Sequence, residues 1–544
     1  MYSIDGSINH SVLRPKPFLI TFATMRKYSL LCVLWVLFAQ AQLTLSTSTL
    51  DFGDVLTTNQ KEITVDIYNT NTYPVTVSQL ALFAEDFTGT INNGTIQPGE
   101  SEKISVIFKP KHNLAYNSEL IIVANDGSEY RIDLQGDGKY SDTYYASTFN
   151  KSYQDLKDEL KSILANNYKN LGYTTARDNM YGDIDNVNGK VTCVYTGREV
   201  TMSTRAEANA NSINCEHTWP QSLFNSNDPE RSDIHHLYPT DASTNSRRSN
   251  NPFGVVTNPS WTDGGSKLGS GVFEPRNEHK GTAARAMLYF AIRYTDYGNF
   301  IDGQETILKQ WHKQFQPSDW DRQRNEKIFG YQKNRNPFID HPEFLDRINN
   351  IGSDDPTPII KDIQVAQDQI DYSYVSPTSE RIIYLINTGN TDISNITQVS
   401  STTGNVVIKS VDVMAKVGDV SPVLISFKSL PEGTYQDNLI INLTSQTGST
   451  IELPIRFTMG QASTSFVESK LMSAVYNEKN QHIQLKNIPL NPIEFEIWNS
   501  NGQLLLNESP KRFNEISFKN QPTGIYFVLL KTHKETYVSK FMVY

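Results

Sequence analysis

The sequence has little cysteine, no excess of positive charge and no long hydrophobic run. Only three of its 544 residues are cysteine, so a dense disulfide framework is excluded as the source of its stability. Asp and Glu outnumber Lys and Arg by 59 to 49, and a net charge of -10 argues against a generally basic nucleic-acid binder. A local basic cleft is still compatible with this charge, because binding depends on the field at the site.

The apolar run Leu30–Phe38 is too short for a membrane-spanning helix of roughly 20 residues, and it has the form of a secretion signal. The basic segment Met25–Lys27 precedes it, and Ala39–Ala41 has the small-x-small pattern of a cleavage site. We therefore predict that residues 1–41 are a leader with a signal peptide, that Met25 is the true start, and that cleavage follows Ala41. An N-terminal membrane anchor is the alternative, and no other run is long enough to span a membrane.

Cys193 and Cys215 are the two cysteines outside this leader. An even pair in an oxidising compartment predicts a disulfide, which would brace the strand that carries Glu216. Two buried free thiols are the alternative.

Residues 43–139 and 359–459 share a pattern of short strands between turn signals. Ile63–Tyr68 and Ile104–Phe108 alternate apolar and polar residues in the first segment, and Arg381–Ile386 is strand-like in the second. We predict an antiparallel β-sandwich for the first segment and a second sandwich of similar layout for the other. The blocks S-T-L-D-F-G-D-V and P-G-E-S-E-K-I-S-V-I-F-K-P of the first segment resemble immunoglobulin-like repeats of the ASPM/hydin kind, which implies a fold rather than an activity.

Residues 140–350 have a different character. Asp155–Asn167 has the apolar spacing of a helix, Ala283–Tyr294 predicts a buried helix, Ile307–Phe315 predicts another, and Val191–Tyr195 is strand-like. The segment is therefore predicted to be an α+β domain. Six of the ten histidines lie here, at positions 217, 235, 236, 279, 312 and 341.

The densest group of reactive side chains lies between Asn214 and Asn250. Glu216 and His217 are adjacent where Pro220 must end a strand, so both side chains are able to turn into one pocket. A carboxylate together with the amide oxygen of Asn245 suits a hard cation such as Mg²⁺. A neutral imidazole beside that metal takes a proton from water near neutral pH.

Each of these residues has a structural alternative. Glu216 is otherwise an ordinary surface carboxylate, His217 a packed histidine and Asn245 a helix cap. Asp233–Leu237 looks like a short strand, so for His235 and His236 we favour a structural role, with a ring hydrogen-bonded to the backbone. The remaining expectations are an exposed Arg247, a phosphate-binding Arg248 and a structural or rim position for His279.

Several blocks resemble the endonuclease I family of secreted bacterial nucleases, which belongs to the His-Me finger (ββα-metal) superfamily. They are N-C-E-H-T-W-P-Q-S and S-D-I-H-H-L-Y-P-T-D-A-S-T-N-S-R-R-S-N-N-P-F-G, then Phe273–Phe290 and Gln332–Ile339. The resemblance covers residues 144–347. It implies a multidomain chain with an α+β ββα-metal nuclease core flanked by all-β immunoglobulin-like sandwiches.

The resemblance also implies roles for matching residues. His217 would be the general base, and Glu216 and Asn245 would hold one Mg²⁺, with Mn²⁺ or Ca²⁺ as alternatives. The metal would polarise the scissile phosphate and leave 5′-phosphate ends. Some relatives hold a phosphate with an arginine in the loop between the two blocks, and Arg231 is the only arginine of that loop here. Our catalytic set is His217 and Arg248, and the other candidates for the phosphate contact are Arg276 and Arg285.

Residues 466–544 are predicted to form a last small β domain. Gly524–Leu530 and Ser539–Phe541 resemble the type A C-terminal sorting domain of the type IX secretion system. The resemblance implies export through the periplasm by that machinery, removal of the tail, and release or surface anchoring. A third binding sandwich is the alternative.

Two functions follow from these patterns. The first is a secreted, metal-dependent, sequence-nonspecific endonuclease for DNA, with RNA as a further substrate; nothing indicates base readout, and binding through a local basic groove would be salt-sensitive. The second is a surface adhesion or nucleic-acid-binding protein with an inactive nuclease core. The intact Glu216, His217 and Asn245 favour the first.

Overall fold

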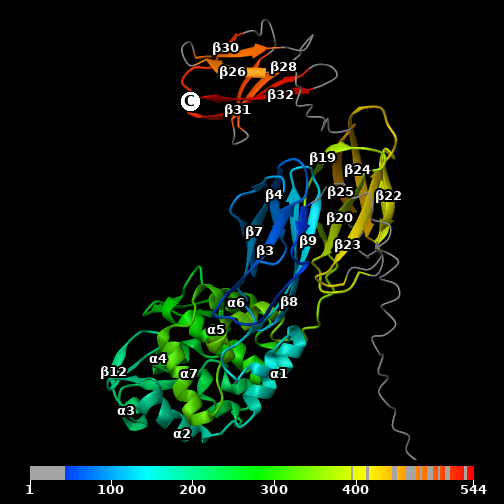
Figure 1. The fold of residues 1–544 in the computed structure, drawn as a ribbon. Helices are drawn as coiled ribbons and strands as arrows, with labels where there is room; N and C mark the ends of the chain where they lie inside the picture. The colour runs from blue at the N-terminus through cyan, green and yellow to red at the C-terminus, as the bar shows by residue number, and fades with distance from the viewer. Residues whose placement is uncertain are drawn as a thin grey trace, which may run out of the picture.

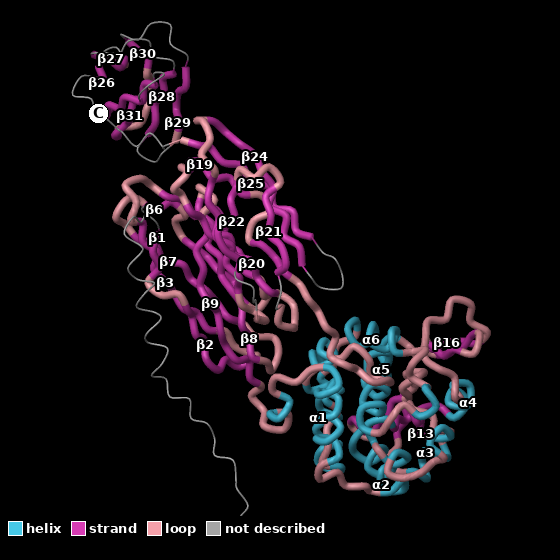
Figure 2. Tube along the Cα trace, turned by 90° about the vertical axis from the view of Figure 1, so that its right-hand side faces the viewer, coloured by secondary structure: helices cyan, strands magenta, loops and turns pink. Residues whose placement is uncertain are grey.

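A computed structural model gives the architecture of the chain. It describes residues 43–393, 396–411, 416–443, 450–460, 473–477, 481–486, 494–499, 503–508, 515–531 and 536–543. The predicted leader at residues 1–41 lies outside the described residues. Figures 1 and 2 show a helix-rich region joined to β-rich regions, which confirms the predicted multidomain α and β organisation. Among the described residues, no helix combines the length and the apolar character needed to cross a membrane.

The first sandwich contains two sheets that enclose one apolar core. Alternating burial along the strands places Phe52, Phe87 and Phe108 inside, with the last two rings stacked at 4.7 Å. One sheet runs in the order β1 (Leu43–Leu45), β3 (Lys61–Asn69), β7 (Ser101–Phe108), β5 (Phe87–Ile91). The other runs β2 (Thr49–Leu56), β9 (Glu129–Lys139), β8 (Ala115–Ala124), β4 (Val75–Leu82), β6 (Thr95–Ile96).

The second sandwich has the same two-layer plan. Its sheets run β18 (Ile363–Val365), β20 (Glu380–Asn387), β23 (Val420–Phe427), β22 (Val406–Val411), and β19 (Ile370–Val375), β25 (Thr450–Met459), β24 (Gly433–Leu443), β21 (Ile396–Ser401). The prediction of an antiparallel first sandwich was wrong in one respect, and the second sandwich shares the difference. β2 pairs with β9 and β19 pairs with β25 in parallel, because each early strand joins the edge of the sheet beside the last strand of its sandwich.

The two sandwiches pack side by side, although the whole helical region separates them in sequence (Figures 1 and 2). An apolar cluster that includes Ile121 and Ile386 lies between them. The buried Glu129 carboxylate accepts hydrogen bonds across the interface from Gln367 Nε2 at 2.8 Å and from the Tyr384 amide at 3.0 Å. The interface therefore combines apolar burial with a carboxylate that is removed from water.

The helical region contains eight α-helices and three small sheets among the described residues. Its centre is α5, whose alanine-rich middle allows close packing on every side. The helices are α1 (Tyr153–Ala165), α2 (Gly172–Asn179), α3 (Arg205–Ala210), α4 (Ala242–Arg248), α5 (Asn277–Arg293), α6 (Glu305–Gln314), α7 (Asp319–Gln332) and α8 (Pro337–Asp340). The sheets are β10 (Asn186–Val187), β11 (Lys190–Thr192), β12 (Glu199–Thr201); β13 (Ile213–His217), β14 (Leu237–Asp241); and β15 (Trp261–Asp263), β16 (Ser266–Gly269), β17 (Val272–Glu274).

The three predicted helices are present as α1, α5 and α6; the ends of α1 and α6 lie within two residues of those expected, whereas α5 begins six residues earlier, at Asn277. Two predicted strands were wrong in extent. The expected strand Val191–Tyr195 ends at Thr192, because the chain turns through Gly197 at a φ of +75°. The expected strand Asp233–Leu237 begins only at Leu237, since Asp233 accepts the amide of His235 and starts a 3₁₀ turn over Ile234–His236.

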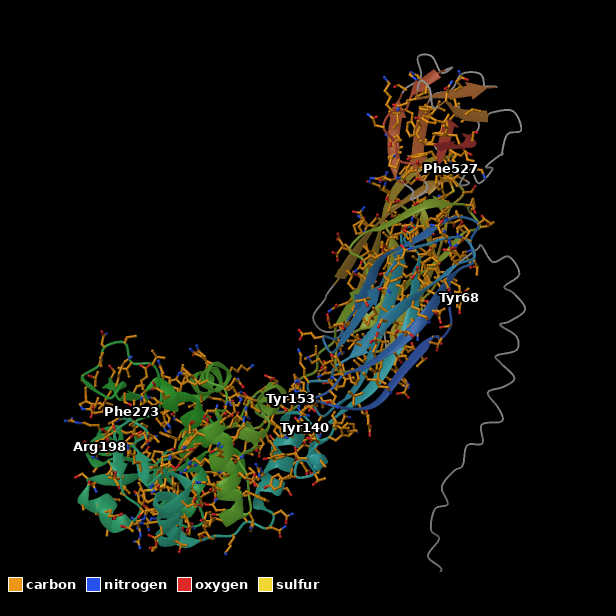
Figure 3. All side chains as sticks on the ribbon, turned by 60° about the vertical axis from the view of Figure 1, so that its left-hand side comes forward. Tyr68, Tyr140, Tyr153, Arg198, Phe273 and Phe527 are labelled. Atoms are coloured by element: carbon orange, nitrogen blue, oxygen red, sulfur yellow. The ribbon has the colours of Figure 1, made fainter. Side chains whose placement is uncertain are left out.

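The junction between the first sandwich and the helical region is built around Tyr140, which Figure 3 labels together with Tyr153. The Tyr140 ring stacks on His341 with the centroids 3.7 Å apart. His341 Nε2 contacts Asp142 at 2.7 Å and its Nδ1 contacts Glu343 at 2.9 Å. Burial opposes but these two acids dominate, and they raise the pKa of His341 to about 9. The charged His341 ring therefore links the segment that contains Asp142 to the segment that contains Glu343.

The C-terminal region is all β in its described parts. One sheet runs β26 (Ser473–Asn477), β27 (His482–Lys486), β30 (Glu515–Ser517), and the other runs β29 (Leu504–Glu508), β28 (Glu494–Asn499), β31 (Gly524–Lys531), β32 (Thr536–Val543). Ile483, Val528 and Phe541 share its core. Neighbouring strands β31 and β32 contain the two blocks that resemble a sorting domain.

The buried Glu129 predicts a pH-dependent interface between the sandwiches. Burial raises its pKa to about 7, above the ordinary value of 4.5. The protonated form is favoured in the folded chain, so its stabilisation is complete below pH 4.5 and is lost as the pH rises towards 7. The loss is on the order of 1 to 3 kcal/mol. Glu129→Gln should therefore slow hydrogen exchange at the Tyr384 amide relative to wild type at pH 8, and have little effect at pH 5.

Hydrogen-exchange mass spectrometry of the full chain measures this on peptides that contain Tyr384. The matched control is Glu100→Gln, at an exposed turn of the same sandwich, which should have no effect at either pH. An equal effect of Glu129→Gln at pH 5 and pH 8 would contradict the electrostatic origin.

Candidate active site

The reactive stretch folds into a strand, a second strand and a short helix. β13 pairs antiparallel with β14, with Glu216 opposite Tyr238, and α4 follows β14 directly. Proline at positions 220 and 239 limits the sheet to two strands, since proline lacks the amide that a ladder needs. This strand–strand–helix unit places Glu216, His217 and Asn245 on adjoining elements.

Glu216 is the buried anion of the site, with 2% of its surface exposed. Its Oε1 accepts the hydroxyl of Tyr195 at 2.6 Å and lies 3.3 Å from Arg248 Nε. Burial raises the pKa of the carboxyl, and the Arg248 guanidinium and the Tyr195 hydroxyl oppose that shift. The other oxygen, Oε2, has no hydrogen-bond partner in the described part of the chain.

Arg248 lies beneath this carboxylate and is fully buried. Its Nη2 donates to the Thr218 carbonyl at 2.6 Å and its Nη1 to the Ser249 carbonyl at 2.8 Å, and the Phe253 ring lies 4.7 Å from its guanidinium carbon. We predicted that Arg248 contacts substrate phosphate; in this structure its contacts are with protein groups. Its two terminal nitrogens donate to backbone carbonyls, its Nε forms the ion-pair contact with Glu216, and the side chain is fully buried.

His217 is mostly buried, with 6% of its surface exposed. Its Nε2 lies 3.2 Å from the Arg231 carbonyl, which only accepts, so Nε2 carries the proton and Nδ1 keeps its lone pair. No described residue hydrogen-bonds Nδ1. Burial, followed by the neighbouring His236, lowers the pKa of His217 well below its ordinary 6.5. The ring is thus held neutral, in the tautomer that is able to accept a proton at Nδ1.

His235 and His236 lie in the core, in line with the structural role that we favoured. Their Nε2 atoms contact the carbonyls of Asn334 and Glu230 at 3.2 and 2.7 Å, and burial lowers both pKa values to about 4. The buried Asp233 beside them accepts hydrogen bonds from the Tyr289 hydroxyl, the Tyr294 hydroxyl and the Gln332 amide. His279 is also buried, packed edge-on against Tyr195 and Tyr238.

Asn245 extends from α4 towards β13. Its Nδ2 donates to the Cys215 carbonyl at 3.4 Å, which leaves its Oδ1 without a hydrogen-bond partner in the described chain. The free Oδ1 and Glu216 Oε2 are an amide oxygen and a carboxylate oxygen, and such a donor set fits a hard cation that retains waters. No group of three or more His, Cys, Asp or Glu able to hold a metal occurs among the described residues, so this two-oxygen set is the candidate.

The predicted Cys193–Cys215 disulfide is absent from the structure. Both cysteines are free and buried, and burial raises both pKa values to about 12. Cys193 lies near Asp241, whereas Cys215 lies near Tyr173 and its Sγ contacts the Glu216 carbonyl at 3.8 Å. The two thiols therefore have different neighbours, and the alternative of two buried free thiols is the one observed.

The other candidate arginines differ in their pairing. Arg285 is buried against Asp321 and the Phe315 carbonyl, and Arg276 pairs with Glu278 at 2.9 Å. Arg247 is exposed, as expected. Arg231 has no acid partner among the described residues, and its guanidinium carbon lies 4.3 Å from the ring centroid of Tyr173.

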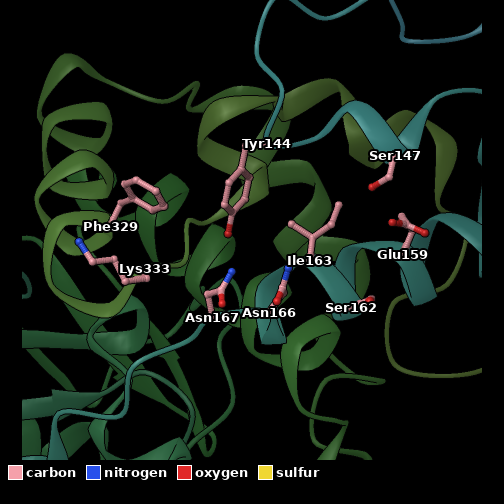
Figure 4. Close-up of a pocket in the computed structure, with 9 residues that line it drawn as sticks. All are labelled: Tyr144, Ser147, Glu159, Ser162, Ile163, Asn166, Asn167, Phe329 and Lys333. Atoms are coloured by element: carbon pink, nitrogen blue, oxygen red, sulfur yellow. The ribbon is translucent and has the colours of Figure 1, made fainter.

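A polar hollow of about 510 Å³ elsewhere in the region does not coincide with this site. Tyr144, Glu159, Asn166 and Lys333 are among its lining residues, drawn in Figure 4. None of the lining residues belongs to the stretch from Asn214 to Asn250. The candidate site is therefore defined by its side chains rather than by the volume of a cavity.

Sequence reasoning missed three neighbours of the site. Tyr195 contacts Glu216, while Tyr173 and Arg177 of α2 lie beside His217 and its loop. These residues are distant in sequence from the reactive stretch and form no motif with it, so only the fold reveals them.

Three segments of the chain match models of known protein families. Residues 152–343 match the family model of endonuclease I, residues 41–137 match a HYDIN/CFA65/VesB-like Ig-like domain, and residues 477–544 match a secretion system C-terminal sorting domain. An extracellular ribonuclease of Bacillus subtilis (strain 168) is 33% identical over 229 residues, which cover 38% of this chain and 78% of that protein. An extracellular ribonuclease of Bacillus amyloliquefaciens is 32% identical over 228 residues, with the same coverage.

Among solved structures, a protein of unknown function from Porphyromonas gingivalis W83 is similar to part of the chain. It is 18% identical, with a TM-score of 0.17, over 18% of this chain and 46% of that one.

The buried pair predicts that Arg248 is needed for folding. Arg248→Ala leaves the Glu216 carboxylate buried without its cation, and such a loss typically costs about 3–5 kcal/mol. The free energy of unfolding in urea should fall by this amount. Its exposed neighbour offers the matched control, since Arg247→Ala should change stability by less than about 0.5 kcal/mol. If Arg248→Ala kept wild-type stability and lost only nucleic-acid binding, the predicted phosphate contact of Arg248 would be supported instead.

Proposed function

The chain belongs to the endonuclease I family, and from this premise we propose that it is a metal-dependent, sequence-nonspecific endonuclease that hydrolyses DNA and RNA to 5′-phosphate ends. It is a secreted or cell-surface nuclease. The C-terminal sorting domain would direct the protein to the type IX secretion machinery. We also propose the domain division given above, with sandwiches at 43–139 and 359–459, a nuclease domain at 140–350 and the sorting domain at 466–544.

One observation carries the proposal: Glu216 and His217 end β13, and Asn245 of α4 bonds the same strand at the neighbouring Cys215 carbonyl. A general base, a carboxylate and an amide oxygen on a strand–strand–helix unit are the parts that a His-Me finger (ββα-metal) nuclease requires. The alternative of an adhesion or nucleic-acid-binding protein with an inactive core has less support, since none of these three residues is missing.

His217 would activate the attacking water. Its Nδ1 takes a proton from the water, whose oxygen then forms a bond to phosphorus. The bond between phosphorus and the 3′ oxygen breaks, so the phosphate stays on the 5′ oxygen of the downstream fragment and the 3′ oxygen leaves to become a hydroxyl by taking a proton from water. The Arg231 carbonyl fixes the ring by accepting a hydrogen bond from Nε2–H, and burial keeps the ring neutral before the reaction.

Glu216 Oε2 and Asn245 Oδ1 would hold the cation. We favour Mg²⁺, with Mn²⁺ or Ca²⁺ as alternatives, because both donors are hard oxygens. A cation bound there supplies Lewis-acid polarisation of the phosphate and charge stabilisation for the leaving oxygen. Tyr195 and Arg248 orient Glu216 through its other oxygen, Oε1, so that Oε2 is left for the metal.

Both DNA and RNA fit this chemistry. Water, rather than a ribose 2′-hydroxyl, is the nucleophile, so the sugar is not part of the reaction. The two similar Bacillus proteins are named extracellular ribonucleases, which supports RNA as one substrate. Recognition through backbone phosphates would make binding salt-sensitive and independent of sequence.

The catalytic assignment predicts loss of cleavage when the base is removed. His217→Ala should lower kcat on supercoiled plasmid with Mg²⁺ by about 10²–10⁴-fold, the usual contribution of a general base. EDTA should abolish cleavage by the wild type. Asn245→Ala should raise the Mg²⁺ concentration needed for half-maximal rate, while Asn250→Ala, an exposed residue just beyond α4, should match wild type.

Cleavage that survives His217→Ala would keep the nuclease and remove our assignment of its base. Absence of cleavage by the wild type with Mg²⁺, Mn²⁺ and Ca²⁺ would favour the inactive-core alternative.

The choice of nucleophile predicts the product ends. Both DNA and RNA fragments should have 5′-phosphates and 3′-hydroxyls, because water attacks and the 3′ oxygen leaves. Mass spectrometry of digested oligonucleotides of each type measures this. Fragments with 2′,3′-cyclic phosphates from RNA, together with uncut DNA, would show attack by the 2′-hydroxyl and refute the proposed mechanism.

A further inference from the structure

Helix α2 places an aromatic ring and a cation beside His217. The Tyr173 ring lies against the His217 ring, with centroids 5.3 Å apart and planes inclined by 35°. Arg177, one helical turn further on, has its guanidinium carbon 4.0 Å from the centroid of the same Tyr173 ring. Because residues at i and i+4 share a helix face, α2 presents both side chains to the His217 side of the molecule.

Arg177 differs from its neighbours in having no acid partner. Its guanidinium makes no hydrogen bond or ion pair among the described residues, and its enclosed Nε is one of the buried polar atoms without a partner. The acids nearby are engaged elsewhere: Asp178 pairs with Arg205, and Glu230 accepts the Tyr297 hydroxyl. The ring of Tyr173 is thus the group that orients Arg177.

A second cation lies on the same ring. Arg231 comes from the loop after β13, has its guanidinium carbon 4.3 Å from the Tyr173 centroid, and is also unpaired. Two uncompensated guanidinium groups on one ring repel each other, and a cation–π contact returns only about 0.5–1 kcal/mol at an exposed site. An anion between or beside them would relieve that repulsion, and a phosphate matches the planar, forked geometry of arginine.

We propose that Arg177, oriented by Tyr173, binds a backbone phosphate of the nucleic acid next to the one that is cleaved. This inference rests on the proposed function. Arg177 contacts the Tyr173 ring and makes no hydrogen bond to His217, so we assign its contact to the strand and not to the reacting atoms. The residue therefore contributes binding energy and register, and proton transfer at His217 does not depend on it.

The position predicts a particular kinetic pattern. A contact made equally in the ground state and the transition state changes KM and leaves kcat unaltered. Arg177→Gln should raise KM for an oligonucleotide duplex about 5- to 20-fold, with kcat within twofold of wild type. Loss of one phosphate contact should also make the plot of the logarithm of the DNA association constant against the logarithm of salt concentration less steep, by about 0.9 for duplex DNA.

The experiment uses the full chain and two readouts. Cleavage is followed with Mg²⁺. Binding of a fluorescent DNA duplex is followed by anisotropy in EDTA at salt concentrations between roughly 50 and 200 mM, a range over which the loss of a phosphate contact measurably changes the affinity. Arg205→Gln is the matched control, because this arginine lies close by but already pairs with Asp178. Arg177→Lys keeps the charge and should restore the salt slope, although not the full affinity, which separates a lost contact from a folding defect.

The outcomes separate the two proposals. If the wild type cleaves but Arg177→Gln has the KM and salt slope of Arg205→Gln, the phosphate contact is refuted and the nuclease assignment stands. If the wild type binds the duplex without cleaving it and Arg177→Gln lowers the salt slope, the contact is supported and the proposed catalysis fails.

Discussion

The site depends on a carboxylate that is taken out of water. Glu216 is almost completely buried, and a buried anion persists only if cations and donors replace its hydration. Arg248 and Tyr195 do so from two different elements, and both act on the same oxygen, Oε1. The structure thereby fixes the orientation of the second oxygen. Arg248 in turn is held by carbonyls at both ends of the reactive stretch, so the ion pair also fastens α4 to the end of β13.

The same use of burial recurs at the joints between regions. Glu129 is buried between two sandwiches, and the charged His341 ring is enclosed by Asp142 and Glu343 where the first sandwich meets the helical region. A nuclease region inserted between two sandwiches must leave and re-enter the β region, and the packed sandwiches bring both connections together (Figure 1). Polar groups specify these contacts, because apolar burial alone fixes proximity without fixing orientation.

The limits of sequence reasoning follow from the same physics. Strand alternation in the sandwiches and apolar spacing in α1, α5 and α6 are local signals, and the corresponding elements form. The adjacency of Glu216 and His217 is local as well. The position of Arg248 was missed because side-chain direction in a short helix depends on what packs beneath it. The free thiols were missed because an even number of cysteines carries no information on distance, and Tyr173 and Arg177 share no motif with the residues that they approach.

Pairing separates the arginines of this region by role. Three arginines are buried and each contacts a carboxylate, so their charges stabilise the fold: Arg248, Arg285 and Arg324. Arg177 and Arg231 contact an aromatic ring and no acid among the described residues, although the chain as a whole has an excess of acidic groups. In such a chain, a cation without an acid partner beside a neutral histidine leaves a locally positive field where the overall charge is negative. A polyanion is attracted by that local field, which is how an acidic protein is able to act on nucleic acid.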